Sequence, residues 1–363
     1  MVTPSGILQP GWIHLKDGVI IGVGDGNPPS HAAHDVVPGW AFPGFVDLHM
    51  HGGGGYDASG SLDEVREAVA YHGRFGTTSM MVSLVTAPAE ALFESLDTIA
   101  TAIETRSAGE PTILGAHLEG PFLAHAQCGA QNSSSFRLPD SDLFREFIAV
   151  ARGHLRVITL APELPGAMEL IDIATSEGVV VAVGHTDASY EIAFEAFQRG
   201  ASLVTHLHNG MRPFHHRDPG PALAGLTSGV LCEVINDGIH VHPAIVREVV
   251  GHSEQQLALV TDAMAATGNG DGAYRLGGRE VVVTGGVARL RENGGLAGST
   301  LTMDAAVRRA AAIGLSMEQL VLASSTNAWR LLGETWRGRI QPGQPADIVL
   351  LTDDFVLREV LIA

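Results

Sequence analysis

The feature that most constrains the fold is a regular alternation of short apolar runs with amphipathic stretches. Apolar runs occur at residues 45–48, 77–84, 112–118, 157–161, 179–183, 203–205, 231–235 and 257–261. Stretches with helical spacing of apolar residues lie between or after them, at 61–75, 89–105, 141–152, 167–176, 189–199, 242–250 and 302–312. Buried parallel strands read as continuous apolar runs, and strands that alternate with helices form α/β folds. Eight such units predict a (β/α)8 TIM-like barrel.

The two ends of the chain do not follow this alternation. Residues 11–23 read as two strands joined by a Lys16-Asp17-Gly18 turn, and residues 338–362 are again strand-like. We expect the two ends to pair as a small β-sandwich domain built from residues 1–41 and 337–363. The catalytic barrel then spans 42–336, with a β insertion near 274–291 where Gly-Gly pairs separate short strands.

The charge balance excludes several classes of partner. The 363 residues include 22 Lys plus Arg and 40 Asp plus Glu, a formal net charge of −18. An acidic chain repels phosphate backbones and anionic lipid headgroups, so we expect no nucleic-acid partner and no membrane association. Two cysteines cannot supply a disulfide framework, and residues 1–10 lack the segments of a secretion signal. These observations predict a cytoplasmic protein.

Polar side chains follow the apolar runs at the positions where a barrel places its active site. They are His49, His51, Glu119, His185, His206, His240 and Asp262. A single histidine at a strand end usually serves a structural role, but these groups would converge on one rim of the barrel. One carboxylate and several imidazoles suit a divalent metal, with zinc first and iron, manganese or cobalt as alternatives. The pattern leaves open whether one or two ions bind.

Two residue types narrow the chemistry further. Asp262, beside a metal-activated water, would accept a proton and later deliver it to a leaving group. Its alternative role is an Asx turn or helix cap before Ala263. Lys16 is the only lysine and lies outside the barrel, which excludes the hydrolases that bridge two metals with a carbamylated barrel lysine.

Several segments closely resemble the N-acetylglucosamine-6-phosphate deacetylase family of the amidohydrolase superfamily. They are His-Leu-Glu-Gly-Pro-Phe at 117–122, Gly-His-Thr-Asp-Ala at 184–188, Thr-His-Leu-His-Asn at 205–209, Asn-Asp-Gly-Ile-His at 236–240, Val-Thr-Asp-Ala at 260–263 and Leu-Ala-Gly-Ser-Thr at 296–300. The resemblance extends from about Gly11 to the tail at 338–347. It covers nearly the whole chain.

The resemblance implies a role for each matching residue. It assigns Glu119, His185 and His206 to the principal metal ion, and it assigns Asp262 to acid and base catalysis next to the ion. His49 and His51 match the members that hold a second ion. Residues matching substrate contacts are Asn209, Gly210 and His240, the last of which would also polarise the amide carbonyl.

The resemblance also implies a homodimer with shared sites. Arg217 matches an arginine that reaches the substrate phosphate in the neighbouring subunit. A guanidinium suits this task because it binds phosphate through two parallel hydrogen bonds. Arg212 is the nearby competitor for the same role.

One loop departs from the family pattern. Gln131 replaces a histidine that touches substrate, and Cys128 replaces a lysine. Gln131 can hydrogen-bond a sugar hydroxyl but cannot become cationic, which leaves affinity and sugar specificity open. Cys128 is either a small loop residue or an oxidisable thiol next to the site.

We therefore expect metal-dependent removal of acetate from N-acetylglucosamine 6-phosphate, in amino-sugar catabolism and cell-wall recycling. One alternative is an amidohydrolase that opens a cyclic amide or deaminates a base, for which the pair Arg217 and Asn209 would have no use. The other is a non-catalytic assembly protein, which the retention of all the candidate ligands disfavours. A purified protein that binds no metal would favour that second alternative.

Overall fold

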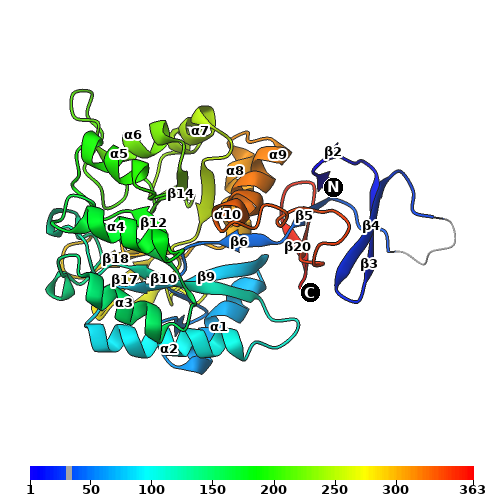
Figure 1. Ribbon diagram of the computed structural model, residues 1–363. Helices are drawn as coiled ribbons and strands as arrows, with labels where there is room; N and C mark the ends of the chain where they lie inside the picture. Colours follow the sequence, from blue (N-terminus) through cyan, green and yellow to red (C-terminus); the bar gives the residue numbers. More distant parts are fainter. Residues whose placement is uncertain (30–34) are drawn as a thin grey trace.

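The computed structural model describes residues 1–29 and 35–363, so part of the predicted N-terminal range 1–41 lies outside the described residues. Its central element is a sheet of eight parallel strands in the order β15-β14-β13-β12-β11-β10-β9-β6 (Figure 1). The strands are β6 (Phe45–Asp47), β9 (Thr77–Val85), β10 (Thr112–Glu119), β11 (Leu155–Leu160), β12 (Val180–Val183), β13 (Leu203–Val204), β14 (Leu231–Ile235) and β15 (Leu257–Val260). All eight apolar runs are strands, and the predicted barrel is confirmed.

Side-chain and backbone hydrogen bonds join the first and last strands of the barrel. The buried carboxylate of Asp47 accepts hydrogen bonds from the backbone N–H of Thr261 at 3.2 Å and from its hydroxyl at 2.5 Å. One step further along, Asp262 donates its backbone N–H to the carbonyl of His49 at 2.8 Å. The junction therefore places Asp262 next to His49.

Helices follow the strands as the apolar spacing predicts. They are α1 (Leu62–Gly73), α2 (Ala89–Glu104), α3 (Ser141–Val150), α4 (Ala167–Ser176), α5 (Tyr190–Gln198), α6 (Gly220–Ser228), α7 (Pro243–His252) and α8 (Met303–Ala312). The sequence also shows why α1 begins where it does, because Ser61 and Glu64 form a capping box. After α8, α9 (Met317–Val321), a π-helical turn (Leu322–Thr326) and α10 (Asn327–Leu331) complete the wall, and the periodicity did not predict them.

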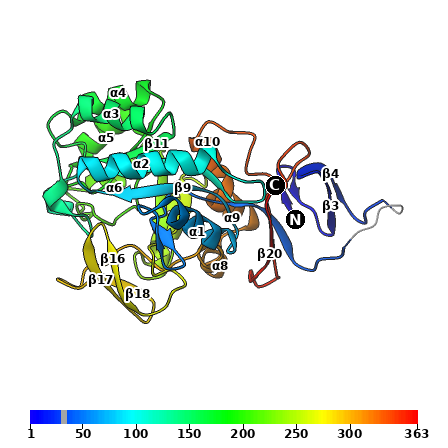
Figure 2. The same ribbon diagram turned by 90° about the horizontal axis from the view of Figure 1, so that it is seen from below.

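The expected β insertion forms a three-stranded antiparallel sheet of β16 (Gly272–Leu276), β17 (Arg279–Thr284) and β18 (Val287–Leu290). Figure 2 shows this sheet, in yellow, projecting from one side of the barrel. Its inner face packs on Met264 and on Val85, at the end of β9. The sheet is thus anchored beside the rim that carries the predicted site.

Strands from both chain ends lie together, away from the site (Figure 1). They are β1 (Val2–Thr3), β2 (Gly6–Ile7), β3 (Gly11–Lys16), β4 (Val19–Asp25), β5 (Trp40–Pro43), β19 (Ile348–Leu351) and β20 (Leu357–Leu361). β19 pairs with both β20 and β5, and Ile20 of β4 exchanges backbone hydrogen bonds with Gln344 and Gly343. An apolar cluster of Met1, Ile20, Ile340, Ala346 and Ile348 joins them. The small β unit is formed by both ends as expected, while the division at residues 41 and 42 falls within β5 and stays a prediction.

Two further short strands, β7 (Gly52–Gly53) and β8 (Tyr56–Asp57), form a hairpin after β6. No helix among the described residues is both long enough and apolar enough to span a membrane.

Candidate metal centre and active site

The candidate ligands occupy equivalent positions at the carboxyl ends of the barrel strands. His49, His185, His206 and Asp262 are each the second residue past the end of a strand, and Glu119 is the last residue of β10. His185, His206 and Asp262 have φ angles of 47°, 29° and 48°, in a region that non-glycine residues rarely adopt. Such strained backbone is concentrated at functional sites. The barrel thus holds these side chains in a geometry that relaxed loops would not adopt.

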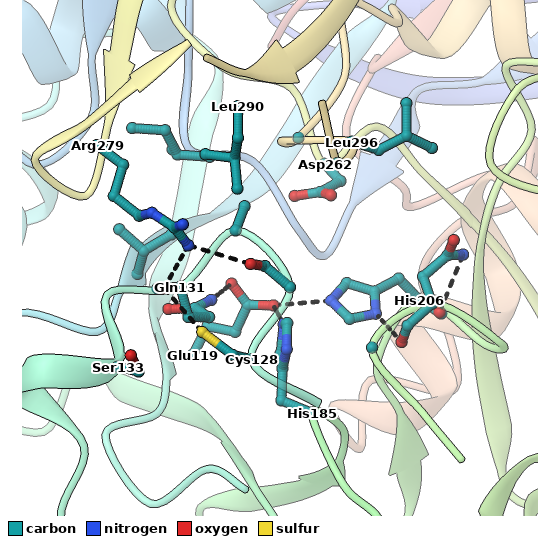
Figure 3. A pocket seen from close by; sticks show the side chains of 18 of the residues that line it. Glu119, Cys128, Gln131, Ser133, His185, His206, Asp262, Arg279, Leu290 and Leu296 are labelled. Carbon is teal, nitrogen blue, oxygen red and sulfur yellow. Dashed lines mark hydrogen bonds and ion pairs between the residues drawn. The ribbon is translucent and has the colours of Figure 1, made fainter. Parts of the chain in front are cut away.

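Glu119 lies at the centre of the cluster (Figure 3). Its Oε1 is 2.8 Å from Nε2 of His206 and 3.0 Å from Nε2 of His185. Its Oε2 is 3.4 Å from Nε2 of His51. The ligand atoms form two groups that share this carboxylate, His49 with His51 and His185 with His206.

Hydrogen bonds at Nδ1 orient the imidazoles. The Nδ1 atoms of His185, His206 and His51 lie 2.9, 3.1 and 3.0 Å from the backbone carbonyls of Gln127, Asn209 and Ser83. Because a carbonyl oxygen only accepts, each Nδ1 must carry the hydrogen, and the lone pair of each neutral ring is on Nε2. Nδ1 of His49 faces a carboxylate oxygen of Glu233 at 3.0 Å, with the same consequence. Four Nε2 lone pairs and the Glu119 carboxylate therefore converge, a donor set that fits divalent metal ions.

Asp262 belongs to the same cluster. Its Oδ1 lies 3.2 Å from Nε2 of His51 and 3.6 Å from Nε2 of His49. Burial alone would raise the pKa of Asp262, but the neighbouring His49 and His51 lower that pKa to about 2. Asp262 is accordingly a carboxylate that can accept a proton from a group bound in front of it.

A cavity of about 810 Å³ opens in front of this cluster. Among the predicted site residues, those that line it are His51, Glu119, Gln131, His185, His206, Asn209, Gly210, His240 and Asp262. Nδ1 of His240 is held by Asp237 at 2.7 Å, which leaves its Nε2 free. Leu276, Arg279 and Leu290 of the insertion also line the cavity, so the β16–β18 sheet forms part of its wall (Figure 3). The cavity can hold a substrate directly against Asp262 and the metal ligands.

Gln131 lies beside the metal ligands. Its side-chain oxygen accepts the backbone N–H of Thr86 at 2.8 Å, and its amide donates to Oε2 of Glu119 at 2.5 Å. Arg279 holds the same loop by donating to the carbonyls of Gly129 and Gln131 at 3.1 and 2.9 Å. The predicted contact of Gln131 with substrate stays a prediction, and the structure adds that this residue orients Glu119.

The two arginines of the 211–218 loop differ in their surroundings. Arg212 pairs with Asp187 at 3.1 Å and with Asp218 at 3.0 Å, so its guanidinium is already engaged. Arg217 is exposed on the same loop, next to His216, and does not line the cavity of its own chain. Cys128 is half-buried at the cavity wall as a free thiol.

Sequence reasoning missed three residues that the structure places around the centre. They are Asp47 at the barrel junction, Glu233 behind His49 and Arg279 on the insertion. A charged residue inside the apolar run 231–235 was a signal that could have identified Glu233. Arg279 gave no such signal, because only the fold brings the insertion to the rim.

The amidohydrolase family model matches residues 40–363. The chain belongs to the amidohydrolase family. The amidohydrolase family is metal-dependent, in agreement with the two ligand groups around Glu119.

Individual amidohydrolases match over most of their length. An N-acetylgalactosamine-6-phosphate deacetylase from Escherichia coli O157:H7 is 35% identical over 100% of this chain and 96% of its own. An N-acetylglucosamine-6-phosphate deacetylase from Lysinibacillus sphaericus is 38% identical over 88% of this chain and 83% of its own. The solved structure of an N-acetyl-D-glucosamine-6-phosphate deacetylase mutant from Mycobacterium smegmatis, in complex with N-acetyl-D-glucosamine-6-phosphate, superposes with a TM-score of 0.92. It is 39% identical and covers 97% of this chain and 93% of that chain.

Proposed function

We propose that this amidohydrolase converts N-acetyl-D-glucosamine 6-phosphate to D-glucosamine 6-phosphate and acetate, in amino-sugar catabolism and cell-wall recycling. The observation that carries the proposal is the position of Asp262, a carboxylate at the boundary between four converging imidazoles and the cavity. Relatives that cover nearly all of the chain are deacetylases of amino-sugar phosphates. We assign the reaction to the cytoplasm, because both cysteines are free.

The ligand geometry supports one or two divalent ions per subunit. Glu119, His185 and His206 would hold the first ion, and His49 and His51 would hold a second, with Asp262 in reach of it. Imidazole and carboxylate donors suit zinc first, and iron, manganese or cobalt as well. A bound ion supplies Lewis-acid activation of a water molecule and of the acetamide carbonyl.

Asp262 moves the proton of the reaction. In amide hydrolysis a water oxygen bonds to the carbonyl carbon and the C–N bond breaks, so one proton must travel from the water to the departing amine. Asp262 accepts that proton as a general base and then donates it to nitrogen as a general acid. His240, fixed by Asp237, directs its free Nε2 at the carbonyl oxygen and stabilises the negative charge that develops there.

The substrate's sugar and phosphate are bound by residues further out. We assign Asn209 and the backbone of Gly210 to the sugar phosphate, and Gln131 to a sugar hydroxyl next to Glu119. Arg217 is exposed and does not line its own cavity, so we assign it to the phosphate in the site of the partner subunit. A homodimer with shared sites follows from that assignment.

N-Acetylgalactosamine 6-phosphate is the second candidate substrate, favoured by the relative from Escherichia coli O157:H7 that matches 100% of this chain. The two sugars are epimers at C4, so the same metal centre and the same proton transfer serve both. They differ only in the direction of one hydroxyl group within the cavity.

Acetate release by the purified protein tests the proposal. Four reactions are compared: both N-acetyl amino-sugar 6-phosphates, unphosphorylated N-acetylglucosamine, and the first substrate with metal-stripped protein. We expect metal-dependent release from N-acetylglucosamine 6-phosphate and little from the unphosphorylated sugar. Faster release from the galactosamine derivative would transfer the assignment to that epimer, and no release from either phosphate would overturn it.

A further inference from the structure

Glu233 is a completely buried acidic residue in the barrel interior that the reaction described above does not use. It lies in the middle of strand β14, within an apolar run, and its side chain has no exposed surface. It does not line the cavity, so it cannot touch a substrate. Within the described part of the chain, its ion-pair partner is the ring of His49.

The environment of His49 differs from that of the other three imidazoles. His51, His185 and His206 donate Nδ1–H to backbone carbonyls, whereas His49 donates it to Oε2 of Glu233 at 3.0 Å. A carboxylate partner withdraws the Nδ1 proton more strongly than a carbonyl and makes Nε2 a stronger donor to a metal. The same Oε2 accepts the backbone N–H of His206 at 3.2 Å, so this oxygen is fixed between both ligand groups.

The other oxygen of Glu233 points to a special function. Oε1 is buried and has no hydrogen-bond partner among the described residues. An unpaired buried oxygen is costly and is rare in folded proteins. A Glu233 carboxylate also adds a third negative charge to those of Glu119 and Asp262. One divalent ion balances two of the three charges, and a second ion balances the remaining one.

We infer that Glu233 is a positioning residue that makes His49 a strong ligand and thereby determines whether a second divalent ion binds at His49 and His51. The inference rests on the metal centre of the proposed function, but not on the identity of the substrate. It predicts that Glu233 affects the two ions unequally, because its carboxylate contacts the ring of His49 and only the backbone of His206.

The test is Glu233→Gln in the full-length protein, stripped of metal and reloaded with Mn²⁺. Glutamine keeps the size and an acceptor oxygen but removes the charge. We expect wild-type protein to bind two ions per chain with the electron paramagnetic resonance spectrum of an exchange-coupled pair. In Glu233→Gln the second ion should bind about 10- to 100-fold more weakly, and the spectrum should be that of isolated Mn²⁺.

Asp47→Asn is the matched control. Asp47 is equally buried and also contacts His49, but it accepts the backbone N–H and not the ring. It should retain both ions, and circular dichroism checks the fold of both variants. If Glu233→Gln folds poorly, Glu233→Asp replaces it, because its shorter side chain withdraws from His49 and should weaken the same ion.

Each other outcome overturns the inference. Unchanged binding of two ions would show that the charge is irrelevant, and equal loss of both ions would show a general effect on the barrel. A wild-type protein that binds a single ion would also overturn it, while leaving deacetylation intact. Conversely, two ions without acetate release would contradict the proposed function and leave the role of Glu233 standing.

Discussion

The Nε2 atoms of His49 and His51 face each other at 3.0 Å, while each ring directs its Nδ1 to a hydrogen-bond acceptor. Two lone pairs at that distance repel unless a cation lies at them. A divalent ion removes the repulsion, and in its absence at least one ring must take up a proton. The packing of these two rings is therefore complete only with a bound cation.

Removal of metal should consequently destabilise the protein. An ion present at about 1,000 times its dissociation constant stabilises the native state by about 4 kcal/mol, because it binds the folded chain and not the unfolded one. We expect chelation to lower the thermal midpoint by several degrees and added zinc to restore it, as measured by calorimetry. An identical midpoint with and without metal would contradict a metal centre here.

Asp262→Asn should lower kcat for acetate release by about 10²- to 10⁴-fold, the usual contribution of a general acid and base. An asparagine cannot carry the proton, but its oxygen keeps the size and position of the carboxylate. Metal content, measured by elemental analysis, should remain nearly unchanged. An active Asp262→Asn variant would show that another group transfers the proton.

Arg217→Ala should raise KM for the phosphorylated substrate by about 10- to 100-fold, because it removes a charge-assisted hydrogen bond. Turnover of the unphosphorylated sugar should not change. Arg199→Ala, which removes an exposed pair with Asp172 and Glu195, is the control.

Mixing subunits tests whether Arg217 acts across a dimer. A heterodimer of Arg217→Ala and Asp262→Asn chains contains one site with an intact Asp262 and an intact partner arginine. Activity should therefore reappear when the two inactive proteins are unfolded and refolded together. If Arg217 serves its own chain, no site in the mixture is complete and activity stays low.

Gly210→Ala should weaken metal binding through His185. The residue has a φ of 58°, and an added Cβ would lie 2.8 Å from Nδ1 of His185. Displacement of that ring should reduce metal affinity by about 10- to 100-fold in a titration. Gly229→Ala is the control, because Gly229 has a φ of 76° but nothing within 4 Å of the added Cβ. Equal metal affinity in the two variants would show that the close approach is harmless.

His72 should make the protein sensitive to mild acid. It is buried on α1 with Nε2 at 3.0 Å from the carbonyl of Gly52, and burial lowers its pKa from 6.5 to about 4. Between these two values the unfolded chain binds a proton that the folded chain does not. Its contribution to stability is therefore full above about pH 6.5 and falls by about 3 kcal/mol as the pH drops to 4.

Chemical denaturation of wild type and His72→Gln across pH 4–7 isolates this effect. Asp47 titrates in the opposite sense, because burial raises its pKa to about 6, so only the difference between the two proteins is informative. That difference should shift in favour of His72→Gln as the pH falls. A constant difference would show that His72 is not the acid-sensitive group.

Local sequence was sufficient for the barrel and for most of the centre. Each apolar run became a strand because burial on both faces requires continuous apolar residues. The ligands could be found because parallel strands end on one rim, so that the residues after Phe45–Asp47, Val180–Val183 and Leu203–Val204 must meet. The positions of His49, His185 and His206 follow from that topology alone.

Tertiary structure alone decided how those groups are oriented and what surrounds them. Which nitrogen of His49 faces the metal depends on Glu233, which lies 184 residues away in sequence. The wall of the cavity depends on Arg279, whose insertion reaches the 129–131 loop only after the barrel has formed. Periodicity reports which face of an element is buried, but hydrogen bonds between distant side chains carry no periodic signal. The sequence by itself therefore determined which residues meet at the rim, and the folded chain decided how each one is held there.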